Sequence, residues 1–247
     1  TSSSKACRSG RKSTTKTATI GLATAPKTTM LVQLIPVTPF QQNCALCVCP
    51  ETKSAVVIDP GGEIHKIEAA LEATGAKLEK ILVTHAHVDH ASAVAELARR
   101  HGVPIEGPHK EDQFWIDLLP GQAAQYGFAP AETFVPDRWL DDGDVCTFGN
   151  LEFQVIHTPG HTPGHVVFFN AKDQVMFVGD VLFQGSIGRT DFPRGDFDTL
   201  ISSIQEKVIP LGQNVTFHCG HGPSSTLGYE AQTNPFLLDP ARYRGMM

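Results

Sequence analysis

Four side chains of the kinds that bind metal ions fall within six residues at the end of one apolar run. The run is Ile81-Leu-Val-Thr, and His85, His87, Asp89 and His90 follow it. Neutral imidazoles and carboxylates are the nitrogen and oxygen ligands that a zinc-like ion takes. A His-x-His pair alone would not establish a metal site, so the prediction depends on whether other segments bring ligands to the same place.

Three further residues of these types also stand at or just beyond the ends of apolar runs. His161 lies in His157-Thr-Pro-Gly-His161-Thr-Pro-Gly-His165, Asp180 closes Val175-Met-Phe-Val-Gly-Asp180, and His221 follows Val215-Thr-Phe-His-Cys-Gly. Strand ends and their loops gather polar groups over a rigid sheet. We therefore expect all seven side chains to meet at one edge of the fold.

Sorted by chemistry, the seven side chains predict a binuclear metal site. The first ion would be held by His85, His87 and His161, the second by Asp89, His90 and His221, and Asp180 would bridge the two. Two divalent ions roughly 3.5 to 4 Å apart hold a hydroxide, since a metal lowers the pKa of bound water to about 7. The sequence thus predicts hydrolysis, with Asp89 and Asp180 as the catalytic carboxylates. Zinc is the first expectation, and iron and manganese accept the same ligands.

Other candidate residues are predicted to support the site or to play no part in it. His165 is expected to lie behind the predicted ligands, because three imidazoles and the carboxylate of Asp180 already complete the site of the first ion. Asp59, which closes an apolar run before Pro60-Gly61, is expected either to orient a ligand imidazole or to form a turn. Neither Gly-x-Ser-x-Gly nor Gly-x4-Gly-Lys-[Ser/Thr] occurs, which excludes a serine nucleophile elbow and a P-loop.

The elements that must position these residues alternate between strands and amphipathic helices, which predicts an α/β (α+β) fold. Strands are expected over 31–38, 45–49, 55–59, 80–84, 145–148, 151–157, 166–169, 174–178 and 214–218. Helices are expected over 63–74, 91–101 and 198–208. In the strand at 45–49 the side chains alternate, so Cys44 is expected on one face and Cys47 and Cys49 on the other, which argues against a shared metal.

Length, charge and hydropathy exclude several classes of protein. The 247 residues suit one domain, and no apolar stretch is long enough to span a membrane. Residues 1–29 carry six of the 20 basic residues and none of the 26 acidic ones, so 14 bases against 26 acids leave the remainder at −12. Nucleic-acid binding depends mainly on basic side chains. We expect neither a nucleic-acid nor a membrane partner.

Residues 1–29 are predicted to lie outside the fold, and residues 30–247 to form a single hydrolase domain. The segment is basic, rich in Ser and Thr and free of acid, a composition that cannot fill a core. A disordered tail, a leader before a native start at Met30 and an organellar transit peptide all fit it. The scattered cysteines are typical of a reducing compartment. The expected location is the cytoplasm, or a mitochondrion or plastid if the segment is a transit peptide.

The order of the motifs resembles the metallo-β-lactamase superfamily, which implies an αββα sandwich with the metals at one edge. Longer segments are similar to the short bacterial type of glyoxalase II. They are Ile35-Pro-Val-Thr-Pro-Phe-Gln-Gln-Asn43, Val57-Ile-Asp-Pro-Gly-Gly62, Gly188-Arg-Thr-Asp-Phe-Pro193 and Gly220-His-Gly-Pro-Ser-Ser-Thr-Leu-Gly-Tyr-Glu230 followed by Asn234-Pro-Phe236. This resemblance implies hydrolysis of glutathione thioesters such as S-lactoylglutathione. Arg189 and Arg194 are the nearest cations available to a glutathione carboxylate.

Rival functions differ from this hypothesis at identifiable residues. A β-lactamase of the superfamily usually has Cys where Asp180 stands, and a flavodiiron domain needs Glu where His87 stands. A persulfide dioxygenase, which holds one iron through two histidines and a carboxylate, shares much of the segment at 188–193 and stays an alternative. A non-catalytic metal-binding protein is the remote one. The sequence predicts no oligomeric state.

Overall fold

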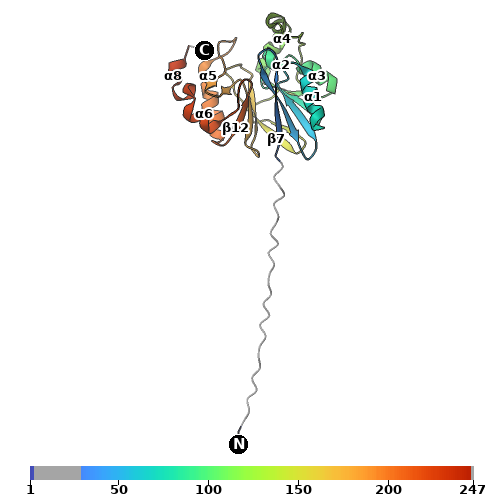
Figure 1. The fold of residues 1–247 in the computed structure, drawn as a ribbon. Coiled ribbons are helices and arrows are strands. Elements are labelled where there is room, and N and C mark those ends of the chain that lie inside the picture. The colour runs from blue at the N-terminus through green and yellow to red at the C-terminus, as the bar shows by residue number, and fades with distance from the viewer. Residues whose placement is uncertain (3–28, 246–247) are drawn as a thin grey trace.

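The computed structural model describes residues 1–2 and 29–245, and from residue 29 onward they form one domain of two stacked sheets flanked by helices (Figure 1). The first sheet has the order β1-β2-β3-β4-β5. Its strands are β1 (Leu31–Val37), β2 (Gln42–Cys49), β3 (Ser54–Ile58), β4 (Lys77–Leu82) and β5 (Ile105–Glu106). The first three strands are antiparallel, whereas β3, β4 and β5 are parallel. The predicted tail over 1–29 falls almost wholly outside the described residues.

The second sheet has the order β13-β12-β9-β8-β7-β6. Its strands are β6 (Val145–Phe148), β7 (Leu151–His157), β8 (Val166–Asn170), β9 (Val175–Gly179), β12 (Thr216–Cys219) and β13 (Ser225–Thr226). Strand β12 runs parallel to β9, and the other pairs are antiparallel. A short ribbon, β10 (Leu182–Phe183) with β11 (Ser186–Ile187), follows β9.

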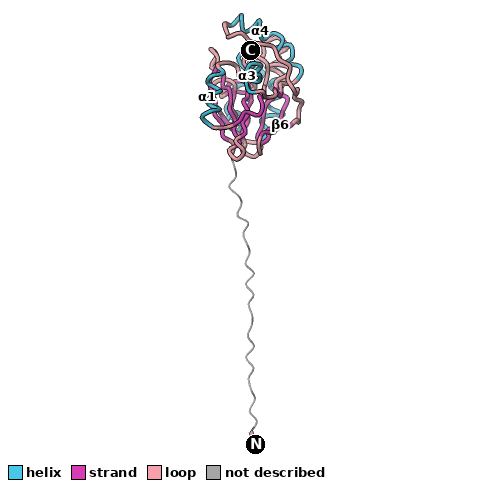
Figure 2. Tube along the Cα trace, turned by 90° about the vertical axis from the view of Figure 1, so that its right-hand side faces the viewer, coloured by secondary structure: helices cyan, strands magenta, loops and turns pink. Residues whose placement is uncertain are grey.

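The helices cover the two outer faces of the sheets (Figures 1 and 2). The first sheet carries α1 (Ile64–Thr74), α2 (Val88–Ala91), α3 (Val94–His101), the 3-10 turn η1 (Lys110–Asp112) and α4 (Gln113–Tyr126). The second carries α5 (Phe197–Ser202), a π-helical turn η2 (Ser203–Val208), a 3-10 turn η3 (Ile209–Leu211), α6 (Leu227–Thr233), α7 (Pro235–Leu238) and α8 (Pro240–Tyr243). The four layers confirm the predicted αββα sandwich. None of the described helices is long and apolar enough to cross a membrane.

The core is divided into three apolar clusters because the central strands of each sheet, β2 and β3 in one and β8 and β9 in the other, bury both of their faces. Strand β2 shows the division: Cys44 packs towards the helices of the first sheet, whereas Cys47 and Cys49 pack between the two sheets against residues such as Phe153 and Phe168. The predicted alternation is therefore confirmed. The third cluster lies between the second sheet and its helices.

The predicted elements are largely present, with shifted ends. The helix predicted over 91–101 is wrong in part, because the structure has two helices, α2 and α3, with a break at Ser92 and Ala93. The backbone N–H of Ala93 donates to the carbonyl of Pro60 at 3.1 Å, a contact outside the helix. Helix α4 was not predicted, since Pro120 and Gly121 stand in its second half and signal a break.

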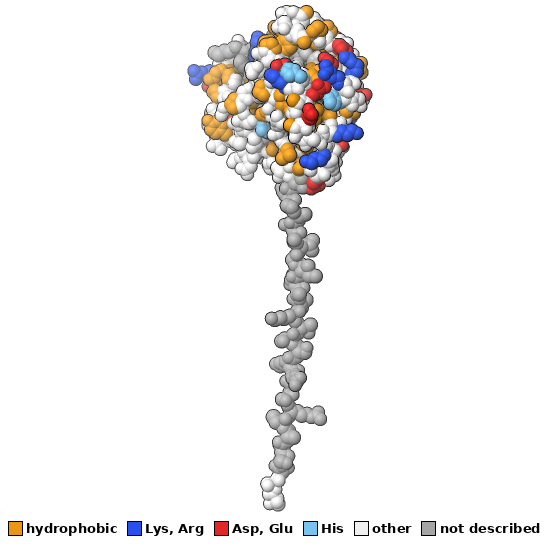
Figure 3. All heavy atoms as spheres, turned by 45° about the vertical axis from the view of Figure 1, so that its right-hand side comes forward, with side chains coloured by type: hydrophobic (Ala, Val, Ile, Leu, Met, Phe, Trp, Pro, Cys, Tyr) orange, Lys and Arg blue, Asp and Glu red, His pale blue; other side chains and the backbone are white. Residues whose placement is uncertain are grey.

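The surface of the domain mixes charges of both signs. Figure 3 shows basic and acidic side chains interspersed on the face that it presents. On α3, Arg100 pairs with Glu96 and with Glu68 of α1, and Arg99 pairs with Glu132. Exposed pairs of this kind contribute little to stability.

Candidate metal centre

The loops that follow four strands carry the seven predicted ligands to one end of the sandwich. Strand β4 of the first sheet leads into the loop and helix α2 that hold four of them. The second sheet supplies His161 from the connection after β7, Asp180 directly after β9, and His221 after β12. The two sheets thus meet at this edge.

The first predicted group is brought together by the fold. Donor atoms of His85, His87 and His161 lie within 4.8 Å of one another, and His161 Nε2 stands 2.9 Å from His87 Nδ1. All three side chains are buried. Burial lowers the pKa of each imidazole, and the neighbouring imidazoles lower those of His85 and His87 further. Neutral imidazoles are the form that a metal ion needs.

The second predicted group lies beside the first. Donor atoms of Asp89, His90 and His221 also fall within 4.8 Å of one another, with His221 Nε2 at 3.1 Å from Asp89 Oδ2. Burial works against a charge on His90, but the carboxylates of Asp180 and Asp89 outweigh it and raise its pKa. Burial opposes a charge on His221 as well, but its hydrogen bond to Asp89 and the nearby charge of Asp180 raise its pKa. Each of these imidazoles thus faces a negative charge.

Asp180 stands between the two groups. Its Oδ1 lies 3.3 Å from His90 Nε2, and its Oδ2 lies 3.6 Å from His221 Nε2 and 3.7 Å from His161 Nε2. Burial would raise the pKa of this carboxyl, but His90, His221 and His161 together lower it well below its usual range. One carboxylate therefore faces ligands of both groups, as a bridging residue would.

Unsatisfied atoms in the cluster fit bound cations. His85 Nε2, His90 Nε2 and Asp180 Oδ1 are buried without a hydrogen-bond partner, and the last two face each other at 3.3 Å. On His87 the nitrogen that faces the group is Nδ1. Buried polar atoms are almost always paired in native structures, and a cluster of exceptions is the pattern expected of side chains that bind an ion. These His and Asp groups can bind metal ions, and their arrangement is consistent with a dinuclear site.

Hydrogen bonds on the far side of the rings turn the predicted ligand atoms inward. His161 Nδ1 lies 2.7 Å from the carbonyl of Arg189, and His221 Nδ1 lies 3.2 Å from that of Phe40. A carbonyl can only accept, so each Nδ1 carries the proton and each Nε2 is free to bind. Such partners commonly fix the tautomer of a metal-binding histidine.

Asp59 takes the supporting position that was one of its two predicted roles. Its Oδ2 lies 3.0 Å from His90 Nδ1 and accepts from the Thr84 hydroxyl, while its Oδ1 accepts from the Thr84 backbone N–H. Thr84 Oγ1 is 3.0 Å from His85 Nδ1. Asp59 has a φ of 52°, but no turn is assigned to it, so the structure supports the first of the two predicted roles.

His165 lies behind the predicted ligands. Its Nε2 accepts a hydrogen bond from the backbone N–H of Asp180 at 3.1 Å, and its ring stacks on His85 at 4.6 Å between centroids. With Nε2 facing a donor, this imidazole supports Asp180 and His85 from outside the two donor groups.

One buried carboxyl near the ligands has no counterpart in the sequence motifs. Asp112, at the start of α4, accepts hydrogen bonds from Ala86, Thr162 and Gly164. Burial raises the pKa of Asp112 to about 7, against the opposing effect of these hydrogen bonds. The Lys110-Glu-Asp112 segment offers no sequence signal for this role, because its partners lie 26 to 52 residues away.

The two predicted substrate arginines lie in the segment next to His161. Arg189 is 62% exposed, pairs with Asp191 and places its guanidinium 4.6 Å from the centre of the Phe192 ring. The Phe192 ring lies 4.8 Å from that of His87. Arg194 instead covers Phe114 of α4, at 4.3 Å. The side chain of Arg189 is thus linked to the first donor group through the ring of Phe192, whereas that of Arg194 packs on the helix.

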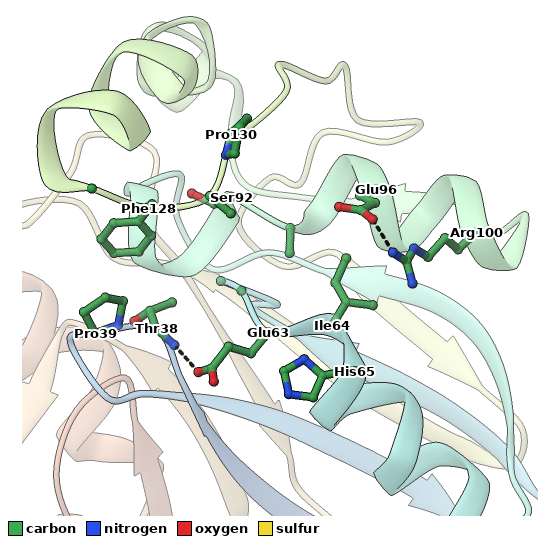
Figure 4. A pocket seen from close by; sticks show the side chains of 15 residues that line it. Thr38, Pro39, Glu63, Ile64, His65, Ser92, Glu96, Arg100, Phe128 and Pro130 are labelled. Atoms are coloured by element: carbon green, nitrogen blue, oxygen red, sulfur yellow. Dashed lines mark hydrogen bonds and ion pairs between the residues drawn. The ribbon is translucent and has the colours of Figure 1, made fainter.

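A cavity of about 370 Å³ lies outside the donor groups, and none of the seven predicted ligands lines it (Figure 4). Pro39 and Phe128 border it on one side, and Ile64 and Arg100 border it on the other. The backbone of Gly61 separates it from Asp89, whose carbonyl would lie 1.5 Å from a Cβ on that glycine. The cavity is therefore a neighbour of the candidate metal centre and not part of it.

Comparison with known proteins gives consistent relatives. Residues 37–221 match the Metallo-beta-lactamase superfamily. The chain is 45% identical over 209 residues to the hydroxyacylglutathione hydrolase GloC of Haemophilus influenzae, covering 84% of this chain and 98% of that protein. The crystal structure of TTHA1623 in a di-iron-bound form is 40% identical in sequence with a TM-score of 0.76, and the match covers 83% of this chain and 100% of that one. The crystal structure of the B3 metallo-beta-lactamase BLEG-1 is 38% identical in sequence with a TM-score of 0.77, and the match covers 84% of this chain and 99% of that one.

Proposed function

The chain belongs to the metallo-beta-lactamase superfamily, and we propose that it hydrolyses a glutathione thioester of the S-lactoylglutathione kind to a hydroxy acid and glutathione. The observation that carries the proposal is the pair of His/Asp donor groups with Asp180 between them. The similarity to GloC supports the thioester as substrate.

The proposed cofactors are two divalent ions, with zinc as the first choice. His85, His87 and His161 would hold one, Asp89, His90 and His221 the other, and Asp180 would contact both. Bound there, the ions would supply Lewis acidity and a water molecule of lowered pKa. The chain contributes the buried setting, the free Nε2 atoms of His161 and His221, and the negative charges of Asp89 and Asp180.

A thioester suits a site without a protein nucleophile. The departing thiolate has a pKa near 8.5, so it leaves far more readily than an amine and needs little protonation. His221 is 30% exposed, whereas His85 and His90 are fully buried, so the His221 side is where substrate can approach.

We assign the binding of a glutathione carboxylate to Arg189, with Arg194 as a second contact. A guanidinium recognises a carboxylate with two parallel hydrogen bonds. Arg189 already presents this geometry, since its Nε and one terminal nitrogen donate to the two oxygens of Asp191 at 3.0 and 2.7 Å. A substrate carboxylate would compete for these donors, beside the ring of Phe192.

The deciding experiment measures bound metal and turnover on the same preparation. Metal content by mass spectrometry should give close to two ions per chain, and S-lactoylglutathione should release free thiol detectable with a thiol reagent. The Asp180→Ala variant should lose most of the metal and the turnover. The matched control is Asp117→Ala, which changes an exposed carboxylate on α4.

Other outcomes would replace the proposal with a named alternative. One iron per chain with oxygen consumption on glutathione persulfide would identify a dioxygenase. Hydrolysis of a β-lactam without thioester turnover would identify a β-lactamase, the activity for which BLEG-1 is named. Bound metal with none of these reactions would leave a non-catalytic metal-binding protein.

A further inference from the structure

Asp112 joins the two loops that carry the first donor group. Its Oδ2 accepts from the backbone N–H of Ala86 at 3.1 Å and from the hydroxyl of Thr162 at 2.9 Å, and its Oδ1 accepts from the N–H of Gly164 at 2.6 Å. The side chain is fully buried. Three donors from two separate segments therefore converge on one carboxylate.

Two of the three partners of Asp112 flank ligands of the first group, and the third, Gly164, lies three residues after His161 in the same loop. Ala86 lies between His85 and His87, and Thr162 directly follows His161. The second group has different direct supports, since Asp59 faces His90 and the carbonyl of Phe40 faces His221. Asp59 also reaches His85 of the first group through Thr84, whereas the hydrogen bonds of Asp112 go only to the two loops that carry the first group.

Helix capping does not account for the orientation of Asp112. It precedes α4 at the N-cap, where an Asp side chain usually accepts a hydrogen bond from the first turn of the helix. Here its side chain makes no capping hydrogen bond and faces the ligand loops. The backbone of this segment is also fastened to the second loop, because His109 N–H donates to the Gly164 carbonyl at 3.0 Å.

We infer that Asp112 is a positioning residue that sets the geometry of the first metal site and leaves the second unaffected. The inference rests on the two-metal arrangement of the proposed function, but not on thioester hydrolysis. A carboxylate is required because both oxygens must accept. The amide of Asn would set its NH₂ group against either the Gly164 N–H or the Ala86 N–H.

Metal release from the zinc-loaded full chain tests this role. A chromogenic chelator in excess would follow the departure of each ion from wild type, from Asp112→Asn and from the control Asp117→Asn. We expect one of the two ions to leave Asp112→Asn about 10 to 100-fold faster, the usual effect of removing a partner of metal ligands. The other ion and the control should match wild type.

Two backgrounds assign the affected ion. His221→Ala leaves the first group complete, so adding Asp112→Asn there should speed release. His161→Ala leaves the second group complete, so adding Asp112→Asn there should change nothing. In cobalt-loaded protein, the visible spectrum of Asp112→Asn should change only in the first background, which a general loss of stability would not produce.

Several results would overturn the inference. In the first, both ions leave Asp112→Asn faster by the same factor, and in the second, both leave at the wild-type rate. In the third, wild type holds a single ion and Asp112→Asn retains it. If Asp112→Asn does not fold, Thr162→Val removes one of the three hydrogen bonds and must still speed release of the same ion. Because no thioester is used, a failure here is separate from a failure of the proposed activity.

Discussion

Gly220 and Asp180 lie so close together that a Cβ atom on Gly220 would come within 2.1 Å of Asp180 Oδ1. The same atom would stand 2.6 Å from Cε1 of His90. Real Cβ atoms do not approach other atoms this closely, so any side chain at position 220 must displace a predicted ligand. The glycine before His221 is therefore required for the shape of the candidate metal centre.

Gly220→Ala is expected to lose most of its bound metal and at least 10²-fold in thioester turnover, because Asp180 can no longer lie between the two groups. Metal content and steady-state kinetics measure both effects. Gly121→Ala is the control, since a Cβ there meets no atom within 4 Å and the residue lies within helix α4. That control should gain about 0.5 to 1 kcal/mol of stability from the better helix propensity of Ala. Full metal occupancy in Gly220→Ala would contradict the prediction.

Asp89→Asn is expected to cut kcat by about 10² to 10³-fold, the usual cost of removing one electrostatic element from an active site. The amide keeps the shape of the side chain but removes the negative charge that lies 3.1 Å from His221 Nε2. The measurement is thioester turnover at known metal content, so that loss of the second ion is counted separately. Near-normal kcat would remove Asp89 from the proposed mechanism.

That the seven candidate ligands would meet could be predicted from the sequence because their signals are local. An apolar run followed by His or Asp marks a strand end, and the four such ends do meet at one edge of the sandwich. The resemblance to a known family then supplied the layer order. Both kinds of information are carried by residues that lie within a few positions of each other.

The rest of the site depends on contacts between distant segments. Asp112 gives no local signal, since its partners are 26 to 52 residues away and it stands in an ordinary helix start. The break between α2 and α3 coincides with the hydrogen bond from the Ala93 N–H to the Pro60 carbonyl. The helical spacing of apolar residues in the sequence gives no sign of this contact. Helix α4 keeps Pro120 in its interior because its buried side, including Trp115 and Leu119, packs into the core.

Arg189→Ala is expected to raise KM for S-lactoylglutathione by about 10-fold and leave kcat within a factor of two or so, the pattern of lost ground-state binding. The reason is that Arg189 is exposed beside Phe192 and touches the first group only through its backbone carbonyl. Arg244→Ala, which changes an equally exposed arginine paired with Asp198, is the control. A fall in kcat with unchanged KM would argue against a substrate contact.

Removal of the metals should make the folded state sensitive to mild acid. Burial lowers the pKa values of four fully buried imidazoles, those of His85, His87, His161 and His165, and also those of the half-buried His157 and His218, which act in the same direction. Below their ordinary value of 6.5, the unfolded chain binds protons that the folded chain does not, so the free energy of unfolding falls as the pH falls. The four groups therefore contribute fully to the free energy of unfolding above pH 6.5, and this contribution is lost as the pH falls below that value.

Two other kinds of group do not reverse this trend. His90 and His221 have raised pKa values, so the stability they contribute grows as the pH falls towards 6.5 and changes little once the unfolded chain is protonated as well. Asp112, with its pKa raised to about 7 from 3.8, takes up a proton in the folded state as the pH falls and opposes the histidines. The single proton of Asp112 opposes the protons of the four buried histidines, so the histidines dominate the pH dependence. Each proton changes the free energy of unfolding by about 1.4 kcal/mol per pH unit.

Denaturant unfolding of the chelator-treated protein at pH 7.5, 6.5 and 5.5 should therefore show stability lost mainly between the last two values. Gln125→Ala, which changes an exposed side chain without a titratable group on α4, is the control and should leave this pH dependence unchanged. His165→Gln should reduce it, because one of the four buried imidazoles is removed while its side-chain oxygen can still accept from the Asp180 N–H. The metal-loaded protein should resist acid longer, since protons must compete with the ions for the same nitrogens. Stability of the metal-free protein that stays level or rises towards pH 5.5 would show that these histidines are not held neutral in the fold.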